Sequence, residues 1–430
     1  MQVLIFNALL YIITAAFFFK KDRHFTIRTL IFLLYSIFAI AGIYTIYDGT
    51  YFSTFGTYSL TNLDVLPYMA NYVIVLGLSL SIGNINQTDV YKNIRYFNSR
   101  IVKNIEIFVI FISLIYVFMQ FEVASILSSY DLGEIYQAAH DGDSLINFPS
   151  QWMNIAYFRT MQILDILYPV IYLIEFAKLT TGKNTKYSIT ILLLILIPRI
   201  MGCAIMANRG GIIFNTASFV FFMVAFWKDM PQKIKLIFKS GSILFLALIV
   251  SYLAAISISR LGDDKAEAGN SVLRYFGEAF PNLGLRVWDV SDRYLLGMRT
   301  FPTIYSFFSD IPNIVTQAKG NGMKHIVFEQ ISGFPILNFK TFYGDLYCEW
   351  GPLFPFVIIS LYLLFIRFLK NKLKDSIFSL LMTYTVYMAL VWGIFNANKI
   401  SETEVENIVT LFLIGYFLRK IQARHKEKAI

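Results

Sequence analysis

Five arginines fall within one long segment in the second half of the chain, residues 260–347. They are Arg260, Arg274, Arg286, Arg293 and Arg299. The guanidinium group presents a planar fork of N–H donors that matches phosphate oxygens, and it stays charged when it is buried. Several converging arginines could therefore hold a pyrophosphate without a metal ion. The alternative for each arginine is a salt bridge with Asp289, Asp292 or an acid of the segment 131–143.

Arg199 is a further candidate for phosphate binding, because it stands inside the apolar stretch 187–206. At ~1.5 Å per helical residue its charge would lie roughly 12 Å below the outer end of that stretch. A charge at such depth costs about 2.5–3.5 kcal/mol and normally faces a water-filled or protein cavity. The alternative is an ion pair with a carboxylate of the preceding apolar stretch, Asp165 or Glu175.

Arg209 directly follows the same stretch, in the sequence Asn208-Arg209-Gly210-Gly211. The two glycines allow a tight turn and the close approach of another group. We interpret Arg209 as a pyrophosphate ligand at the outer side of a membrane. An arginine that extends to the lipid headgroups is the alternative.

Several titratable side chains near the end of the long segment are candidate general bases. They are His325, Glu329, Asp345 and Glu349, and Glu278 is a further catalytic candidate beside Arg274. Histidine titrates near neutral pH, and burial can raise the pKa of a carboxylate toward neutrality. His325 and Glu329 share one face if their stretch is helical. The sequence therefore offers a proton acceptor for an alcohol, without deciding which one acts.

The sequence lacks the motifs of several other classes of protein. It has no P-loop, no Gly-x-Ser-x-Gly and no cluster of histidine and cysteine, and its two cysteines show no metal-ligand spacing. Carboxylates within the apolar stretches are few for an ion-coupled transporter. We expect neither a metal ion nor a cofactor. Asp345 and Glu349 could bind a divalent ion if their stretch is helical, and that alternative stays open.

The elements that carry these residues are predicted to be membrane-spanning helices. The chain is 57% hydrophobic and 15% charged, which excludes an ordinary soluble domain. About 11 stretches approach the ~20 apolar residues that a span needs. They are 2–19, 28–47, 65–83, 105–124, 163–179, 187–206, 211–227, 240–259, 350–369, 376–395 and 404–418. We predict an all-α polytopic membrane protein with short helices in its large outer loop.

The basic residues predict the orientation of these spans. Most Lys and Arg lie in alternate gaps, which the positive-inside rule assigns to the cytoplasm. The N-terminus is then outside and the C-terminus cytoplasmic, and residues 125–162 and 260–347 form extracytoplasmic loops of a single membrane domain, 1–430. The same rule accounts for the net charge of +9, so we expect no nucleic-acid partner.

In architecture and in local motifs the chain resembles the bacterial oligosaccharide repeat-unit polymerases of O-antigen and capsule synthesis, the Wzy type. The architectural likeness is many spans with one dominant outer loop in the second half. Three local stretches are also similar, namely Asn208 to Gly211, Tyr275 to Glu278 with Asn282, and Thr341-x-x-Gly344-Asp345 with Glu349-Trp350-Gly351.

The resemblance implies a glycosyltransferase that uses undecaprenyl pyrophosphate-linked oligosaccharides at the outer face of the cytoplasmic membrane. It would transfer the growing glycan to the sugar of a new lipid-linked repeat unit. Arg199, Arg209, Arg274, Arg286 and Arg293 would bind pyrophosphate, and membrane lipid and a chain-length regulator would be partners. The alternatives are a flippase or transporter of lipid-linked sugars and a glycan transferase similar to O-antigen ligase.

Overall fold

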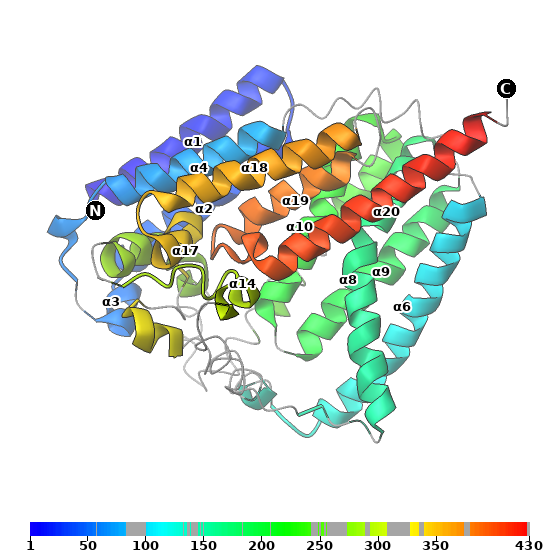
Figure 1. The fold of residues 1–430 in the computed structure, drawn as a ribbon, viewed down its shortest axis with the longest axis horizontal. Coiled ribbons are helices and arrows are strands. Elements are labelled where there is room, and N and C mark those ends of the chain that lie inside the picture. The colour runs from blue at the N-terminus through cyan, green and yellow to red at the C-terminus, as the bar shows by residue number, and fades with distance from the viewer. Residues whose placement is uncertain are drawn as a thin grey trace.

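The computed structural model describes most of the chain (Figure 1). The residues outside the description are 57, 83–99, 132, 136–137, 139–144, 147, 149, 183, 207, 242–247, 249–250, 253–254, 256–272, 289–292, 308–326, 335–338, 374–378 and 428–430. The side chains of residues 62, 101, 209, 398 and 421–427 are also outside it. Every regular element among the described residues is a helix, which confirms the predicted all-α class.

Ten long helices form the body of the described structure. They are α1 (Gln2–Asp22), α2 (Ile27–Tyr47), α4 (Leu66–Ile82), α6 (Arg100–Leu127), α8 (Gln151–Thr180), α9 (Thr185–Ile205), α10 (Arg209–Phe226), α18 (Phe354–Lys372), α19 (Ser379–Trp392) and α20 (Glu402–Glu427). Short helices connect them. They are α3 (Thr50–Phe55), η1 (Leu60–Asn62), η3 (Trp227–Asp229), α13 (Ala279–Asn282), η4 (Leu283–Val287), α14 (Pro302–Ser306), α17 (Thr341–Trp350) and η5 (Asn398–Ile400).

Six described helices are long and apolar enough to cross a membrane: α1, α2, α6, α9, α10 and α18. Helices α4 and α19 are apolar but shorter. The chain is therefore an all-α protein with the helices of a membrane protein, while the number of about 11 spans stays a prediction. Ten of the predicted stretches coincide with the long helices, and 240–259 lies largely outside the described residues.

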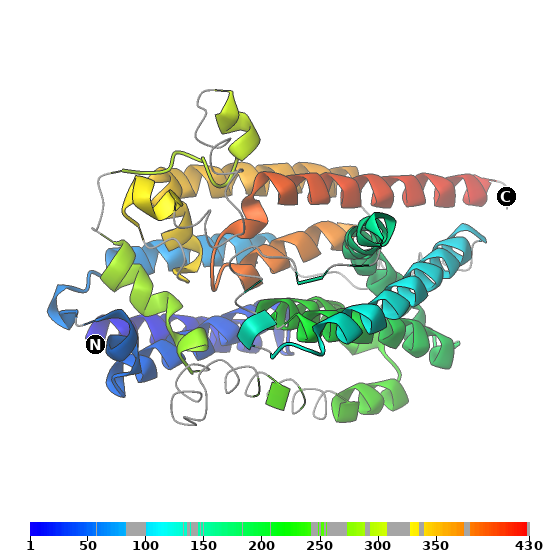
Figure 2. The ribbon, with the colours of Figure 1, turned by 90° about the horizontal axis from the view of Figure 1, so that it is seen from below.

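The helix ends of one side of the assembly carry basic residues. Helices α1, α18 and α20 run in the same direction, from lower left to upper right in Figure 1. Lysines occupy the last turns of α1 and α18, and Arg419 and Lys420 lie on the C-terminal half of α20. The start of α1 and the end of α20 lie at opposite ends of the assembly in Figure 2. This grouping of charges agrees with the alternating gaps in the sequence.

The described parts of the long loop are packed into the helix assembly. Gly277 contacts α2 so closely that a Cβ there would lie 2.7 Å from the backbone oxygen of Ala41. Asn71 on α4 donates to the Tyr11 hydroxyl at 2.9 Å and accepts the backbone N–H of Tyr343 on α17 at 3.1 Å. These contacts fix α13 and α17 against the first helices. The loop 125–162 is shorter than predicted, because α6 extends to Leu127 and α8 begins at Gln151.

Candidate functional site

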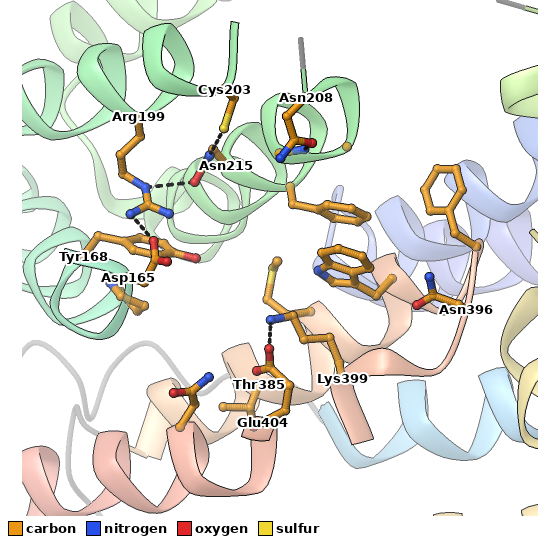
Figure 3. Close-up of a pocket in the computed structure, with 18 of the residues that line it drawn as sticks. Asp165, Tyr168, Arg199, Cys203, Asn208, Asn215, Thr385, Asn396, Lys399 and Glu404 are labelled. Atoms are coloured by element: carbon orange, nitrogen blue, oxygen red, sulfur yellow. Dashed lines mark hydrogen bonds and ion pairs between the residues drawn. The ribbon is translucent and has the colours of Figure 1, made fainter. Parts of the chain in front are cut away.

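A cavity of about 1060 Å³ is lined by residues of α8, α9, α10, α19 and α20 and of the short elements and segments between the long helices. Charged and amide side chains project into it from these helices (Figure 3). Its charged lining residues come from four regions of the chain and are Asp165, Arg199, Arg274, Glu278, Lys399 and Glu404. The volume is at the upper end of what small-molecule sites have, so the cavity suits a large polar ligand.

Arg199 on α9 reaches the cavity and forms three contacts there. Its Nη1 lies 2.5 Å from Asp165 Oδ1 on α8, and its Nε donates to Asn215 Oδ1 on α10 at 2.9 Å. Its guanidinium lies over the ring of Tyr168, 4.1 Å from the centroid. Arg199 therefore faces a cavity and has Asp165 as its ion-pair partner, while its role as a phosphate ligand stays a prediction. Glu175, the other proposed partner, instead lies 3.4 Å from Lys178 Nζ.

One face of the Arg199–Asp165 pair stays open to the cavity. The side chain of Asp165 is 47% exposed, whereas that of Arg199 is 11% exposed. The accessible carboxylate of Asp165 can therefore accept a hydrogen bond from a ligand hydroxyl, while the guanidinium of Arg199 compensates the negative charge. The sequence pointed to Asp165 only as a partner of Arg199.

The turn before α10 is built on Asn208 and Gly211, as the glycine pattern predicts. The Asn208 side chain caps the helix by accepting the Gly211 N–H at 2.8 Å. A Cβ at Gly211 would lie 2.5 Å from Cys203 Sγ, which confirms the predicted close approach. Arg209 is the first residue of α10, and its side chain lies outside the described part of the structure.

Arg274 and Arg286 of the long loop are brought together around the ring of Phe55 on α3. Their guanidinium carbons lie 5.9 Å and 4.5 Å from the ring centroid. Arg274 Nε is 3.6 Å from Glu278 Oε2, and its Nη1 donates to Thr54 Oγ1 at 3.1 Å. Among the described residues, the buried Nη1 of Arg286 has no hydrogen-bond acceptor. Two guanidinium groups thus converge beside the cavity wall with donor capacity left over.

The opposite wall carries an ion pair that the sequence analysis did not select. Lys399 Nζ pairs with Glu404, and both residues line the cavity (Figure 3). Beside them Trp392 stacks on Phe214 with centroids 3.5 Å apart and an interplanar angle of 9°. Lys399 is a basic residue in a predicted outer gap, where basic residues are rare, and that signal could have identified it.

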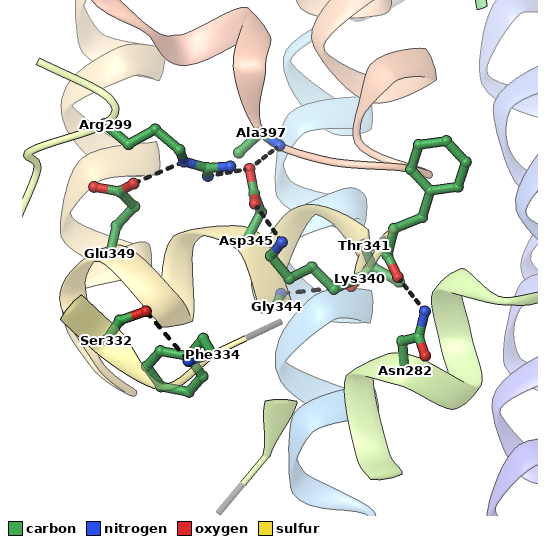
Figure 4. A network of polar contacts seen from close by, with 11 residues as sticks. Asn282, Arg299, Ser332, Phe334, Lys340, Thr341, Gly344, Asp345, Glu349 and Ala397 are labelled. Atoms are coloured by element: carbon green, nitrogen blue, oxygen red, sulfur yellow. Dashed lines mark hydrogen bonds and ion pairs between the residues drawn. The ribbon is translucent and has the colours of Figure 1, made fainter. Parts of the chain in front are cut away.

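Asp345 lies in a buried ion network behind this wall (Figure 4). Asp345 Oδ2 is 2.6 Å from Arg299 Nη2 and accepts the Ala397 N–H at 2.8 Å, and its Oδ1 is 3.4 Å from Lys340 Nζ. Glu349 Oε1 accepts from Arg299 Nε at 2.9 Å. The Asp345 side chain is 0% exposed, so this candidate base is placed as an internal ion-pair partner.

The two carboxylates of the network have opposite pKa shifts. Burial alone would raise the pKa of Asp345, but Arg299 and Lys340 together lower it to about 2. Burial raises the pKa of Glu349, and Arg299 offsets this only in part. Asp345 is therefore firmly ionised at neutral pH, which makes it a poor proton acceptor.

The remaining candidates lie in different parts of the structure. Glu278 lines the cavity and is a buried residue beside Arg274. Glu329 lies on the helical stretch 327–332 and is not a cavity-lining residue, and Arg293 is exposed. His325 lies outside the described residues. Within the described ranges no three His, Cys, Asp or Glu side chains are grouped as a metal site requires.

No protein-family model, no curated protein and no solved structure matches this chain. A functional assignment therefore depends on the residues of the cavity itself.

Proposed function

We propose that this chain is a membrane glycosyltransferase that polymerises lipid-linked oligosaccharide repeat units, as its resemblance to the Wzy-type polymerases implies. The observation that carries the proposal is the large cavity with Arg199 and Arg274 in its wall and Arg286 close by. A pyrophosphate-linked glycan needs both a large polar cavity and fixed cations. The cavity has the volume, and the arginines fixed by neighbouring carboxylates are the cations.

In the proposed reaction the bond between the anomeric carbon of the donor glycan and its pyrophosphate oxygen breaks. A bond forms between that carbon and a hydroxyl oxygen of the acceptor repeat unit. The bonding electrons leave with the lipid pyrophosphate, and the hydroxyl proton passes to a carboxylate. No oxidant or nucleotide is consumed, which suits a reaction outside the cell.

Arg274 and Arg286 are the proposed ligands of the departing pyrophosphate, because both lie against Phe55 and Arg286 keeps a free donor among the described residues. Fixed donors aimed at developing charge lower the barrier most when the site excludes water. Arg199 and Arg209 are proposed to bind the phosphates of the second lipid. Of the predicted bases, Glu278 has the position that fits, since it lines the cavity.

The proposed orientation places the cavity at the outer face of the bacterial cytoplasmic membrane. The basic helix ends lie at the other end of the assembly and would be cytoplasmic under the positive-inside rule. The N-terminus would then be outside. Lipid tails would remain in the bilayer beside the exposed apolar helix faces, while their pyrophosphates reach the arginines.

Reconstitution with a defined substrate tests the proposal. Purified protein in lipid nanodiscs is given undecaprenyl pyrophosphate-linked repeat units, and the products are separated by length on a gel. We expect a ladder from the wild type, a loss of the ladder in Arg274→Ala, and a normal ladder in the control Arg159→Ala. Arg159 is an exposed arginine of α8 that contacts Gln162.

Two outcomes would contradict the proposal. One is a wild-type protein that gives no ladder with any lipid-linked repeat unit from its own host. The other is transport of the lipid-linked sugar across a proteoliposome membrane without any increase in glycan length, which would identify a flippase.

A further inference from the structure

The cavity wall between α19 and α20 is a connecting segment that contains little regular helix. Phe395, Asn396 and Lys399 of this segment line the cavity. The N–H groups of Phe395 and Asn396 bond locally to the Trp392 carbonyl, but the Ala397 N–H and the Phe395 carbonyl bond to other elements, so the position of the segment depends on those partners. Those partners decide where the amide of Asn396 and the ammonium of Lys399 lie.

Two stretches of the long loop provide these partners from behind the wall. The Ala397 N–H donates to the Asp345 carboxylate at 2.8 Å, and the Phe395 carbonyl accepts the Lys340 N–H at 3.0 Å. The Glu402 N–H donates to the Thr300 carbonyl at 2.9 Å, and Glu402 Oε2 accepts the Thr303 N–H at 3.0 Å. The segment is therefore attached at its start and at its end.

The attachment at Asp345 is part of a charge-balanced cluster. Arg299 and Lys340 supply two positive charges, and Asp345 and Glu349 supply two negative charges. Asp345, Glu349 and Lys340 are essentially inaccessible, and the Arg299 side chain is 13% exposed. A buried ion pair tolerates little displacement, because a separated partner remains charged and desolvated. The cluster thus holds the Asp345 carboxylate still, and that carboxylate holds Ala397.

We infer that the network of Arg299, Lys340, Asp345 and Glu349 positions the Phe395–Lys399 wall of the cavity, so that Arg299 and Asp345 are positioning residues for the glycosyl transfer. The link to glycosyl transfer rests on the proposed function, whereas the link to the wall does not. None of the four residues lines the cavity. They act on it through Ala397 and through the backbone of Phe395.

A thiol probe on the wall tests this inference without any substrate. Asn396→Cys is introduced into a Cys203→Ser background, and its rate of alkylation by a small maleimide is measured in detergent. Asp345→Asn keeps the shape and an acceptor for Ala397 but removes the charge, and Arg299→Met removes the partner cation. We expect each substitution to change the rate severalfold, with Arg299→Lys falling between Arg299→Met and the parent.

Arg28→Met is the matched control, because Arg28 also forms a buried ion pair with an aspartate. Its Nη2 lies 3.0 Å from Asp22 Oδ1 at the turn between α1 and α2, and Arg28 is not a cavity-lining residue. We expect no change in the alkylation rate at position 396. An equal change in this control would overturn the inference, and so would unchanged rates in folded Asp345→Asn and Arg299→Met proteins.

If the variants do not fold, hydrogen exchange of the unmodified protein tests whether the Phe395–Lys399 wall is held in place. The peptide 393–402 should be protected nearly as well as α19, because the amides of Ala397 and Glu402 are bonded to the Asp345 carboxylate and the Thr300 carbonyl. Exchange of this peptide much faster than that of α19 would overturn the inference. In the polymerisation assay the folded variants should lose up to about 100-fold in kcat, which a displacement of ~1 Å can cause.

The two proposals fail in different ways. A wild-type protein that does not polymerise its substrate rejects the glycosyltransferase, yet the alkylation and exchange rates still report on the wall. Unchanged alkylation with normal polymerisation rejects the positioning role alone.

Discussion

At the scale of single residues, Arg199 connects three helices through one guanidinium. It contacts Asp165 on α8 and Asn215 on α10 through different nitrogens. A lysine carries the same charge but not the fork, so it cannot keep both contacts. We expect Arg199→Lys to lower the rate of polymer formation by roughly 100-fold, the scale of one lost oriented donor. Polymer formation by purified variants measures this, with Arg159→Lys as the control that keeps full activity.

The two cysteines give a second prediction at this scale. Cys203 lines the cavity, whereas Cys348 is completely buried on α17 and burial raises its pKa to about 12. Alkylation requires the thiolate, so Cys203 should react in the folded protein and Cys348 only after denaturation. Lipid-linked repeat units should slow the reaction at Cys203. Mass spectrometry of the alkylated protein, with Cys203→Ser for comparison, checks both statements, and early labelling of Cys348 would contradict its burial.

At the scale of elements, α17 presents two carboxylates to Arg299, Asp345 and Glu349. Their pKa shifts predict that substitution of the two residues lowers the stability of the fold by different amounts. The pKa of Asp345 falls from 3.8 to about 2 on folding, so its charge stabilises the folded state by about 2 kcal/mol above pH ~4. This stabilisation is lost as the pH falls through about 2. Burial raises the pKa of Glu349, and Arg299 offsets this only in part, so the charge of Glu349 adds no stabilisation of the kind that Asp345 gives.

We therefore expect Asp345→Asn to lower the thermal unfolding temperature at pH 7 clearly more than Glu349→Gln does. The difference between Asp345→Asn and the wild type should shrink as the pH is lowered toward 3. Unfolding of the detergent-solubilised proteins, followed by light scattering and tryptophan fluorescence, measures it. Equal losses for the two substitutions would indicate that the charge of Asp345 has no special role.

The sequence predicted the elements better than the site. The length of the apolar stretches predicted the ten long helices, because a membrane span is one continuous stretch of sequence and can be recognised without the fold. Arg199 was identified for the same reason, since a charge inside an apolar stretch needs an explanation. Asp345 was taken for a base because its burial depends on Arg299 and Ala397, which are distant in sequence. Lys399 was not selected although it is a basic residue in a predicted outer gap, because its place in a cavity with Arg199 and Asp165 depends on helices distant in sequence.

At the scale of the whole molecule, the distribution of charge predicts which parts face each compartment. Helices α1, α18 and α20 run in the same direction in Figure 1, with lysines in the last turns of α1 and α18 and Arg419 and Lys420 on the C-terminal half of α20. We expect a cysteine at Lys372 to be protected from impermeant reagents in intact cells and a cysteine at Arg293 to be labelled. The measurement uses a Cys203→Ser background. Labelling at 372 but not at 293 would invert the orientation and contradict the proposed function.

The pairing of charges within the cavity has a consequence for turnover. Arg199, Arg274 and Lys399 each stand beside a carboxylate, respectively Asp165, Glu278 and Glu404. A polyanion that binds must therefore replace these carboxylates as the partner of each cation. When the polyanion dissociates, the ion pairs with the carboxylates form again. Such exchange weakens retention and makes dissociation fast. A cavity of this kind favours repeated rounds of binding and release over storage of its ligand.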